Sequence, residues 1–175
     1  PESMYEDISV WDAGRKVDVQ RSLTGKGQSG PIQALTGLQF VHAKVGSVSA
    51  TLPASPWFST AGPAMYGGVL AWACDSALTG AAWTTLDAGA VAASLDLQVR
   101  FLRPVMLDGS TLDVSGWVVH DGRSIKVTQA EITNAEGKTV AIATGSSMVI
   151  EGAVDQLVAG RRTDDVIRDL AAGEE

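Results

Sequence analysis

The chain has 175 residues, of which 45% are hydrophobic and 19% charged. This composition fits one globular domain and excludes disordered and collagen-like proteins. Its 20 acidic and 13 basic side chains give a net charge of −7, which provides no general attraction to phosphate backbones or anionic lipids. Neither nucleic acid nor a membrane is therefore expected as a partner.

The first segment, residues 1–30, is polar and rich in glycine, without a sustained period, and we interpret it as an N-terminal extension. It lacks the basic start and apolar run of a signal peptide. Cys74 is the single cysteine of the chain, so a cytoplasmic protein is expected. Residues 25–30 match the dinucleotide-binding pattern G-x-G-x-x-G. Because no strand precedes them, we interpret them as a plain loop.

A short helix is expected over residues 31–37, which begin with proline and end with glycine. Residues 38–52 favour an extended chain, and residues 53–66, with three prolines and a glycine, predict a loop. Residues 67–86 are apolar on nearly every helical face. Because they also contain Asp75 and several hydroxyl residues, they predict a buried helix of a globular protein and not a membrane span.

After this helix the period of the sequence changes to two. The apolar positions predict the buried face of a strand: Leu95, Leu97, Val99 and Phe101. The positions between them predict its polar face: Ser94, Asp96, Gln98 and Arg100. Three further strands are expected over 110–120, 124–134 and 139–150, with Asp-Gly or Glu-Gly at the turns. The predicted fold is α+β, with one antiparallel sheet wrapped around one helix, because a helix that is apolar all round needs cover.

The residue that departs most from this pattern is Asp75, the only charged residue between Lys44 and Asp87 and near the middle of the predicted helix. A buried carboxylate needs a partner, a raised pKa or a function. It is either a structural anchor bonded to amides or hydroxyls, or a catalytic acid, base or nucleophile. Thr79 lies one helical turn further on the same face. Its hydroxyl either orients a water held by Asp75 or bonds a backbone carbonyl.

The start of the helix, Tyr66-Gly67-Gly68, has two interpretations as well. Free amides at a helix N-terminus can stabilise an oxyanion, whereas a glycine pair there can also serve loop-to-helix geometry alone. Gly67 and Asp75 are separated by about 12 Å along a straight helix, so they cannot act on one carbonyl. If two copies of the helix pair antiparallel about a two-fold axis, Gly67 of one approaches Asp75 of the other. The spacing therefore predicts a shared site in a dimer.

In the order and spacing of its motifs, the chain from about Gly30 to Glu151 resembles the hotdog-fold acyl-CoA thioesterases, in particular the phenylacetate-degradation (PaaI-like) group. The resemblance rests on these segments: 37–52, Tyr66-Gly67-Gly68 with Asp75, 95–104, Gly122-Arg123-Ser124 and 137–141. It implies a hotdog domain over 31–151, with five to six antiparallel strands around one long central helix. An N-terminal extension over 1–30 and a C-terminal helical tail over 152–175, amphipathic over 153–170, would flank it.

The resemblance also implies roles for particular residues. The family's His-Gly-Gly, with an acidic residue nine positions after the histidine, falls on Tyr66, Gly67, Gly68 and Asp75. Gly67 would polarise the thioester carbonyl through its amide, and Asp75 would attack the thioester or activate water. Thr79 matches a hydroxyl that holds the nucleophilic water in some members. Tyr66 departs from the family's histidine: its hydroxyl can donate a hydrogen bond in a similar way, or its larger ring can narrow the acyl pocket.

Substrate-binding positions follow from the same resemblance. Thr60 stands where an asparagine or glutamine of the family contacts the thioester. The phosphates of CoA need cations and backbone amides. Arg103 and the turn Gly122-Arg123-Ser124 are the candidates for these contacts.

The function implied is hydrolysis of an acyl-CoA or aryl-CoA thioester to the free acid and CoA, in a homodimer that assembles further to a tetramer. No metal or redox cofactor is expected, and coenzyme A is part of the substrate.

A hotdog hydratase would need a histidine paired with an acid, but residues 43–119 contain no histidine. His42 and His120 have no partners at triad or metal-ligand spacing. Serine-hydrolase chemistry lacks its G-x-S-x-G elbow. The remaining alternative is a non-catalytic acyl-CoA-binding protein, for which Tyr66 is the main argument.

Overall fold

The computed structural model describes residues 31–87, 90–152, 157–158 and 161–162, and the structural statements below concern this part of the chain. Its helices are α2 (Pro31–Thr36), the 3-10 turn η2 (Pro56–Phe58) and α3 (Gly67–Trp83). Its strands are β1 (Gln39–Lys44), β2 (Ser47–Pro53), β3 (Val91–Phe101), β4 (Thr111–Asp121), β5 (Ile125–Thr133), β6 (Thr139–Ile150), β7 (Leu157–Val158) and β8 (Arg161–Arg162).

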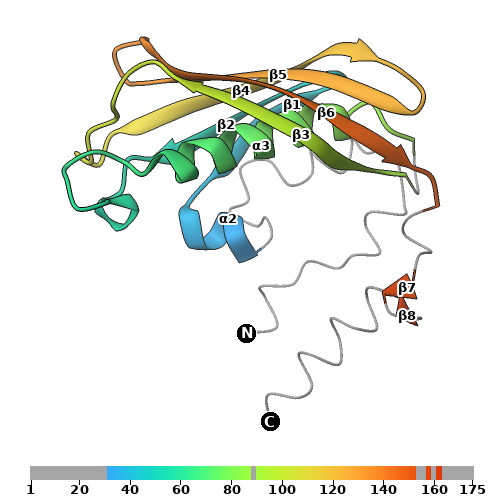
Figure 1. Ribbon diagram of the computed structural model, residues 1–175, viewed down its shortest axis with the longest axis horizontal. Helices are drawn as coiled ribbons and strands as arrows, with labels where there is room; N and C mark the ends of the chain where they lie inside the picture. Colours follow the sequence, from blue (N-terminus) through green and yellow to red (C-terminus); the bar gives the residue numbers. More distant parts are fainter. Residues whose placement is uncertain (1–30, 88–89, 153–156, 159–160, 163–175) are drawn as a thin grey trace.

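Six strands form one antiparallel sheet in the order β1-β2-β4-β5-β6-β3. The sheet curves over α3, which lies along its inner face and contacts every strand from β2 to β6 (Figure 1). The order follows from chain connectivity: β4, β5 and β6 form a meander, while β3, which leaves the end of α3, pairs with the far side of β6. The fold class expected from the sequence is confirmed.

The core lies between α3 and the inner face of the sheet. The helix contributes a face of small and medium apolar side chains, Leu70, Ala73, Cys74, Ala77, Leu78 and Ala81. The strands contribute inward-facing residues that alternate with exposed ones, as in β4, where Leu112 and Val114 are fully buried. The opposite side of α3 is only half-buried. In the single chain, the sheet therefore covers one side of this helix and leaves the other side partly open.

The sheet and the helix approach each other to backbone contact at Gly116 in β4. A Cβ on Gly116 would overlap the carbonyl oxygen of Ala77, in the middle of α3. Because a backbone oxygen cannot move aside as a flexible side chain can, only glycine fits at this crossing. The position of α3 on the sheet is set by this contact.

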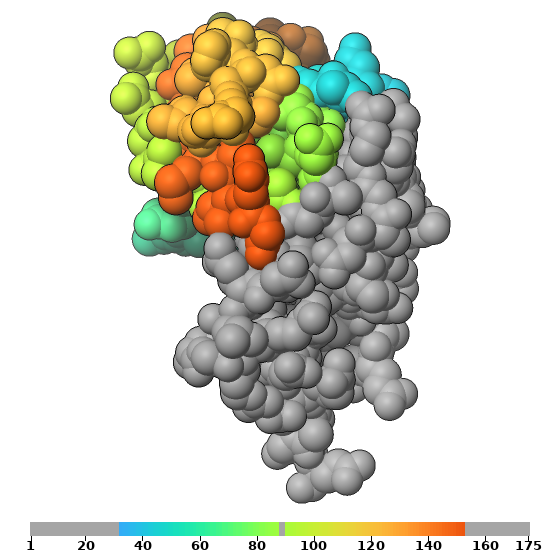
Figure 2. All heavy atoms as spheres, turned by 90° about the vertical axis from the view of Figure 1, so that its right-hand side faces the viewer, coloured from blue at the N-terminus to red at the C-terminus, as the bar shows by residue number. Residues whose placement is uncertain are grey.

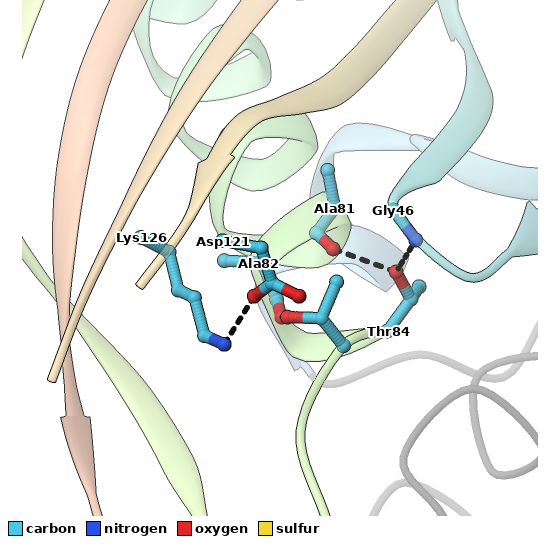
Figure 3. Close-up of polar contacts among 7 residues, drawn as sticks. Gly46, Ala81, Ala82, Thr84, Asp121 and Lys126 are labelled. Atoms are coloured by element: carbon cyan, nitrogen blue, oxygen red, sulfur yellow. Dashed lines mark hydrogen bonds and ion pairs between the residues drawn. The ribbon is translucent and has the colours of Figure 1, made fainter. Parts of the chain in front are cut away.

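The far end of α3 is fixed by a threonine. The Thr84 hydroxyl donates to the carbonyl of Ala81 at 2.6 Å and accepts from the amide of Gly46 at 2.8 Å (Figure 3). Gly46 has φ +80° and forms the tight turn between β1 and β2. The single extended segment expected over 38–52 is therefore wrong: it is a hairpin, because Gly46 adopts the left-handed conformation that reverses the chain.

The remaining elements differ less from their predicted bounds. The short helix and the long helix begin where expected, and α3 ends three residues early, at Trp83. The predicted helix over 153–170 is wrong at residues 157–158 and 161–162, which pair as the strands β7 and β8. The other tail residues, the extension 1–30 and the dinucleotide-like segment 25–30 lie outside the described residues.

The Gly116 contact yields a stability prediction. Gly116→Ala is expected to lower the free energy of unfolding by about 1–3 kcal/mol, because the added methyl group forces α3 away from the sheet. Gly62→Ala is the matched control. A Cβ at Gly62 meets no atom within 4 Å, so its effect should stay within about 0.5 kcal/mol. Urea denaturation of both variants measures the difference in free energy of unfolding. Equal stability would show that α3 and β4 can move apart at Gly116 without cost.

Candidate active site

The start of α3 is held in place by the loop before it. The amide of Met65 donates to the carbonyl of Val105 at 2.8 Å, and the amide of Tyr66 donates to the carbonyl of Phe58 at 2.8 Å. Tyr66 is the N-cap residue, with an extended backbone and no capping bond from its side chain. The first amides of a helix have no acceptor within the helix. The amides of Gly67 and Gly68 therefore have no acceptor within the helix, and their role as oxyanion donors stays a prediction.

Two aromatic rings flank these glycines. A Cβ on Gly67 would lie 3.2 Å from the ring of Phe101 in β3, and a Cβ on Gly68 would lie 2.5 Å from the ring of Tyr66. A side chain at Gly67 would need the Phe101 ring to shift by a few tenths of an ångström, and one at Gly68 would need the Tyr66 ring to move aside. Tyr66 itself remains 58% exposed, with its ring lying against the first turn of the helix.

Asp75 lies on the half-exposed side of α3 and has a defined partner. The Ser94 hydroxyl donates to Asp75 Oδ1 at 2.8 Å, and the hydroxyls of Ser94 and Thr79 are 3.1 Å apart. A carboxylate on the helix is therefore linked to two hydroxyls, one from its own helix and one from β3. The predicted proximity of Asp75 and Thr79 is confirmed, but full burial of Asp75 is not, since this side of α3 is only half-covered.

Ser94 is the site residue that sequence reasoning missed. Strict alternation placed it with Asp96 on the polar outer face of β3. The register of β3 against β6 shifts between Ser94 and Asp96, so Leu95 is an extra residue. This bulge turns Ser94 toward α3, while Asp96 still bonds Ser146 on the neighbouring strand. Period-two patterning cannot locate a bulge, because one additional residue reverses the phase of the alternation.

The strand that carries Ser94 is an edge of the sheet. Among the described strands, β3 pairs with β6 on one side only. Leu95 and Phe101 are each 53% exposed, and Leu97 is exposed as well. An edge strand of eleven residues with exposed apolar side chains is a ready surface for pairing with another strand.

The other predicted binding residues are spread over the domain. Thr60 is exposed in the loop before α3. Arg103 lines a hollow beside Gly67 and Phe101, and its guanidinium donates to the carbonyl of Thr139.

The turn Gly122-Arg123-Ser124 lies at the other end of the molecule, where Arg123 and Thr85 line a second hollow. Figure 2 looks at this end, where the amber β4–β5 turn, the orange end of β6 and the green residues after α3 lie together. One chain therefore places Arg103 and Arg123 at opposite ends of α3 and does not bring them together.

The two histidines are both exposed, His42 in β1 and His120 in β4. Within the described residues, no group of three or more His, Cys, Asp or Glu side chains is arranged to hold a metal ion. In the same part of the chain, no helix has the length and apolar character needed to cross a membrane.

Residues 62–141, which include the glycine pair, Asp75, Ser94 and Arg123, match the family model described as "Thioesterase superfamily". This region, 80 of the 175 residues of the chain, is similar to the thioesterase superfamily. A search of curated proteins gives no match.

Solved structures of similar fold agree with this thioesterase-superfamily assignment. The E. coli PaaI protein from the phenylacetic acid degradation operon is 25% identical, with a TM-score of 0.69, covering 78% of this chain and 95% of that one. A Streptococcus mutans protein bound to acetyl CoA is 28% identical, with a TM-score of 0.61, covering 65% and 89%. A Haemophilus influenzae thioesterase, 20% identical with a TM-score of 0.68, covers 76% and 91% and shares the fold. The expected resemblance to hotdog thioesterases and to the PaaI-like group is confirmed.

Cys74, next to Asp75 on α3, is fully buried against the sheet. Burial, and secondarily the charge of Asp75, raises the pKa of the Cys74 thiol to about 12. The thiolate is the nucleophilic form of cysteine, so this residue is inert at neutral pH and is a packing residue of the core.

Cys74 should therefore not react with Ellman's reagent in the folded protein. At pH 8, four units below the raised pKa, only roughly one thiol in ten thousand is ionised, and the sulfur is also shielded. The expected result is no colour release from the native chain and one equivalent of released thiolate in denaturant, measured by absorbance. Rapid labelling of the native protein would contradict the burial of this face of α3.

Proposed function

We propose that the domain hydrolyses acyl-CoA thioesters, and that each site combines the amide of Gly67 with the Asp75 carboxylate of the partner subunit. The observation that carries the proposal is the Ser94 to Asp75 hydrogen bond of 2.8 Å, which holds one oxygen of a half-exposed carboxylate on the central helix. A structural anchor would be expected to use both oxygens, or to be buried among its partners. Here the arrangement orients the carboxylate toward the uncovered side of α3.

The chemistry follows from these positions. With Ser94 on Oδ1, Oδ2 of Asp75 is free to take a proton from water or to attack the thioester carbonyl directly. In the water route, the water oxygen bonds to the carbonyl carbon and its proton passes to Asp75. The Gly67 amide donates to the oxyanion that forms. The carbonyl bond then re-forms as the carbon–sulfur bond breaks, and the proton held by Asp75 passes to the departing CoA thiolate, which leaves the free acid and CoA. Thr79, beside Ser94, helps to hold the water.

The dimer is required because one subunit cannot supply both parts. Gly67 and Asp75 are about 12 Å apart along α3, whereas an oxyanion donor and a base must lie within hydrogen-bond distance of one reacting group. Two features support antiparallel pairing of two subunits: the open edge of β3 and the exposed apolar side chains along it. The outer face of the sheet, where Trp117 and Ile142 are exposed, supports further assembly to a tetramer.

The same pairing accounts for the separated arginines. When two α3 helices run antiparallel, the C-terminal end of one lies beyond the N-terminal end of the other. Arg123 of the partner subunit would then lie near the N-terminal end of this α3. We propose that Gly122, Arg123 and Ser124 bind the nucleotide phosphates of CoA. Arg103, at the hollow beside Gly67, would contact the pantetheine arm or the phosphates, and Thr60 the thioester.

The choice of a CoA thioester as substrate is supported by similarity. The S. mutans structure contains acetyl CoA, and a similar protein of Streptococcus pneumoniae, 24% identical, is described with coenzyme A. Tyr66 and Phe101 flank the glycine pair, so their rings would limit the acyl group. A second candidate function, acyl-CoA binding without hydrolysis, is favoured by Tyr66 alone, because its ring packs on Gly68 where the family has a histidine.

Replacement of Asp75 distinguishes hydrolysis of acyl-CoA from acyl-CoA binding without hydrolysis. Asp75→Asn is expected to lower kcat by about 10² to 10⁴, the range that a general base or nucleophile contributes, and to leave CoA affinity within about twofold of the wild type. Ser94→Ala should lower kcat less, by about 10 to 10², because the carboxylate remains and loses only its orientation. Release of CoA from short, medium, long and aromatic acyl-CoAs measures both. Equal turnover in wild type and Asp75→Asn would refute the assignment, and binding without turnover would support the non-catalytic alternative.

The oxyanion donor and the dimer are tested together. Gly67→Pro removes the amide hydrogen at the first helical position, where proline is well tolerated, and should lower kcat by about 10² to 10³. Gly67→Ala, which keeps the amide, is the control. Subunits carrying Gly67→Pro and subunits carrying Asp75→Asn should regain activity when mixed, because each mixed dimer has one intact site. Roughly a quarter of wild-type activity is expected for random exchange of subunits. No recovery after confirmed exchange would place both groups in one chain.

A further inference from the structure

At the end of α3 remote from the glycine pair, the structure contains a buried lysine that the proposed reaction does not use. Lys126 is the first inward-facing residue of β5, in line with Thr128, Ala130 and Ile132, and its side chain is only 8% exposed. An ammonium group removed from water to this extent needs compensation by an opposite charge or by dipoles.

The compensation comes from the strand opposite. The Lys126 ammonium forms an ion pair and hydrogen bond with Asp121, the last residue of β4 and its direct partner in the β4–β5 register. Figure 3 shows this pair beside the last turn of α3, near Ala82. The C-terminal end of a helix carries partial negative charge, which also favours an ammonium group there. The Asp121 side chain is 55% exposed, so the pair joins the buried end of the helix to the surface.

Between the two charged residues lies the turn that carries Arg123. Its backbone is tightly constrained: a Cβ on Gly122 would lie 2.6 Å from the carbonyl oxygen of Ile125 and 2.9 Å from His120 Nε2. The carbonyl of Ser124 accepts from the amide of Val149 in β6 at 2.9 Å. The ion pair closes the base of this turn, and Arg123 is exposed at its tip.

We infer that Asp121 and Lys126 are a positioning pair, which holds the turn 122–124 in the conformation that binds the phosphates of CoA. The inference rests on the proposed function of this turn. Lys126 lines the same hollow as Arg123, but its side chain is largely covered and its ammonium is already paired with Asp121, so we assign it to the turn and not to the phosphates. It acts through the backbone of the turn, by fixing the direction in which the Arg123 guanidinium and the turn amides point.

The pair also explains why a polar contact is kept at a position suited to an apolar one. Replacing a buried ion pair with neutral residues of similar size is often neutral or stabilising. The fold alone therefore does not require this pair. Orientation of a ligand-binding turn would require the pair, because an ion pair has one preferred geometry, whereas an apolar contact would allow several.

The test removes both charges at once, in Asp121→Asn/Lys126→Met, so that no unpaired charge remains buried. We expect this variant to melt at or above the temperature of the wild type, yet to show a KM for acyl-CoA raised about tenfold, with kcat unchanged. The KM for the same acyl group on pantetheine, which lacks the nucleotide phosphates, should not change. The double variant leaves the net charge of −7 unchanged, and Lys138→Met, beside the exposed β5–β6 turn, controls for the loss of a lysine outside the Arg123 turn. This control variant should leave both KM values unchanged.

A double-mutant cycle distinguishes positioning from a separate contact. Arg123→Ala should raise the KM for acyl-CoA by a similar factor, and adding the neutral pair to it should cause little further change, since both act through the same turn. Three outcomes would each overturn the inference. They are additive effects of the two changes on KM, an unchanged KM for acyl-CoA in the neutral-pair variant, and an equal rise in KM for the pantetheine thioester.

Failure of the inference can be distinguished from failure of the proposed function. If the wild type hydrolyses no thioester, isothermal titration with CoA alone replaces KM in the same cycle, and the same tenfold loss of affinity is expected. A wild type that neither hydrolyses acyl-CoA nor binds CoA refutes the proposed function and the positioning pair together.

Discussion

The backbone contact between α3 and the sheet is the constraint on which the other features depend. Ala77 approaches β4 so closely that only Gly116 fits opposite it, and alanines occupy one face of the helix along the same line. With so little side-chain volume between helix and sheet, α3 lies inside the curve of the strands. Its opposite side, which carries Asp75 and Thr79, is left half-covered. The apolar packing on one side of the helix thus determines which side presents the chemistry.

Within that framework, the candidate site is assembled from helix and edge strand together. Asp75 and Thr79 come from α3, and Ser94 comes from β3. Under the proposed dimer, β3 is also the strand at which the partner pairs. The hydrogen bond that orients the carboxylate then lies at the subunit interface, and association of subunits would complete the site and cover its exposed apolar side chains in one step. This is consistent with an acid that needs no deep burial within its own chain.

In the proposed dimer, the two ends of α3 have different functions. The N-terminal end presents amides beside aromatic rings, suited to a carbonyl oxygen. The C-terminal end lies beside Lys126, Asp121 and the Arg123 turn, suited to anionic phosphates. In a single chain these ends are far apart, and only an antiparallel arrangement of two chains would join them. The long, extended shape of a CoA thioester matches such a divided site.

Much of this was accessible from the sequence. The apolar run beginning at Gly67 determined the central helix, and the period of two determined β4, β5 and β6 to within a residue or two, because burial on one or both faces imposes a repeat that residue types record. The isolated charge of Asp75 identified the candidate acid for the same reason. Tertiary structure decided the rest. Gly46 divided one extended segment into a hairpin, and the bulge at Leu95 turned Ser94 toward Asp75. The Lys126–Asp121 pair formed across two strands. These three features depend on a local backbone conformation or on a contact between residues distant in the sequence. Neither of these causes produces a periodic pattern of residue types.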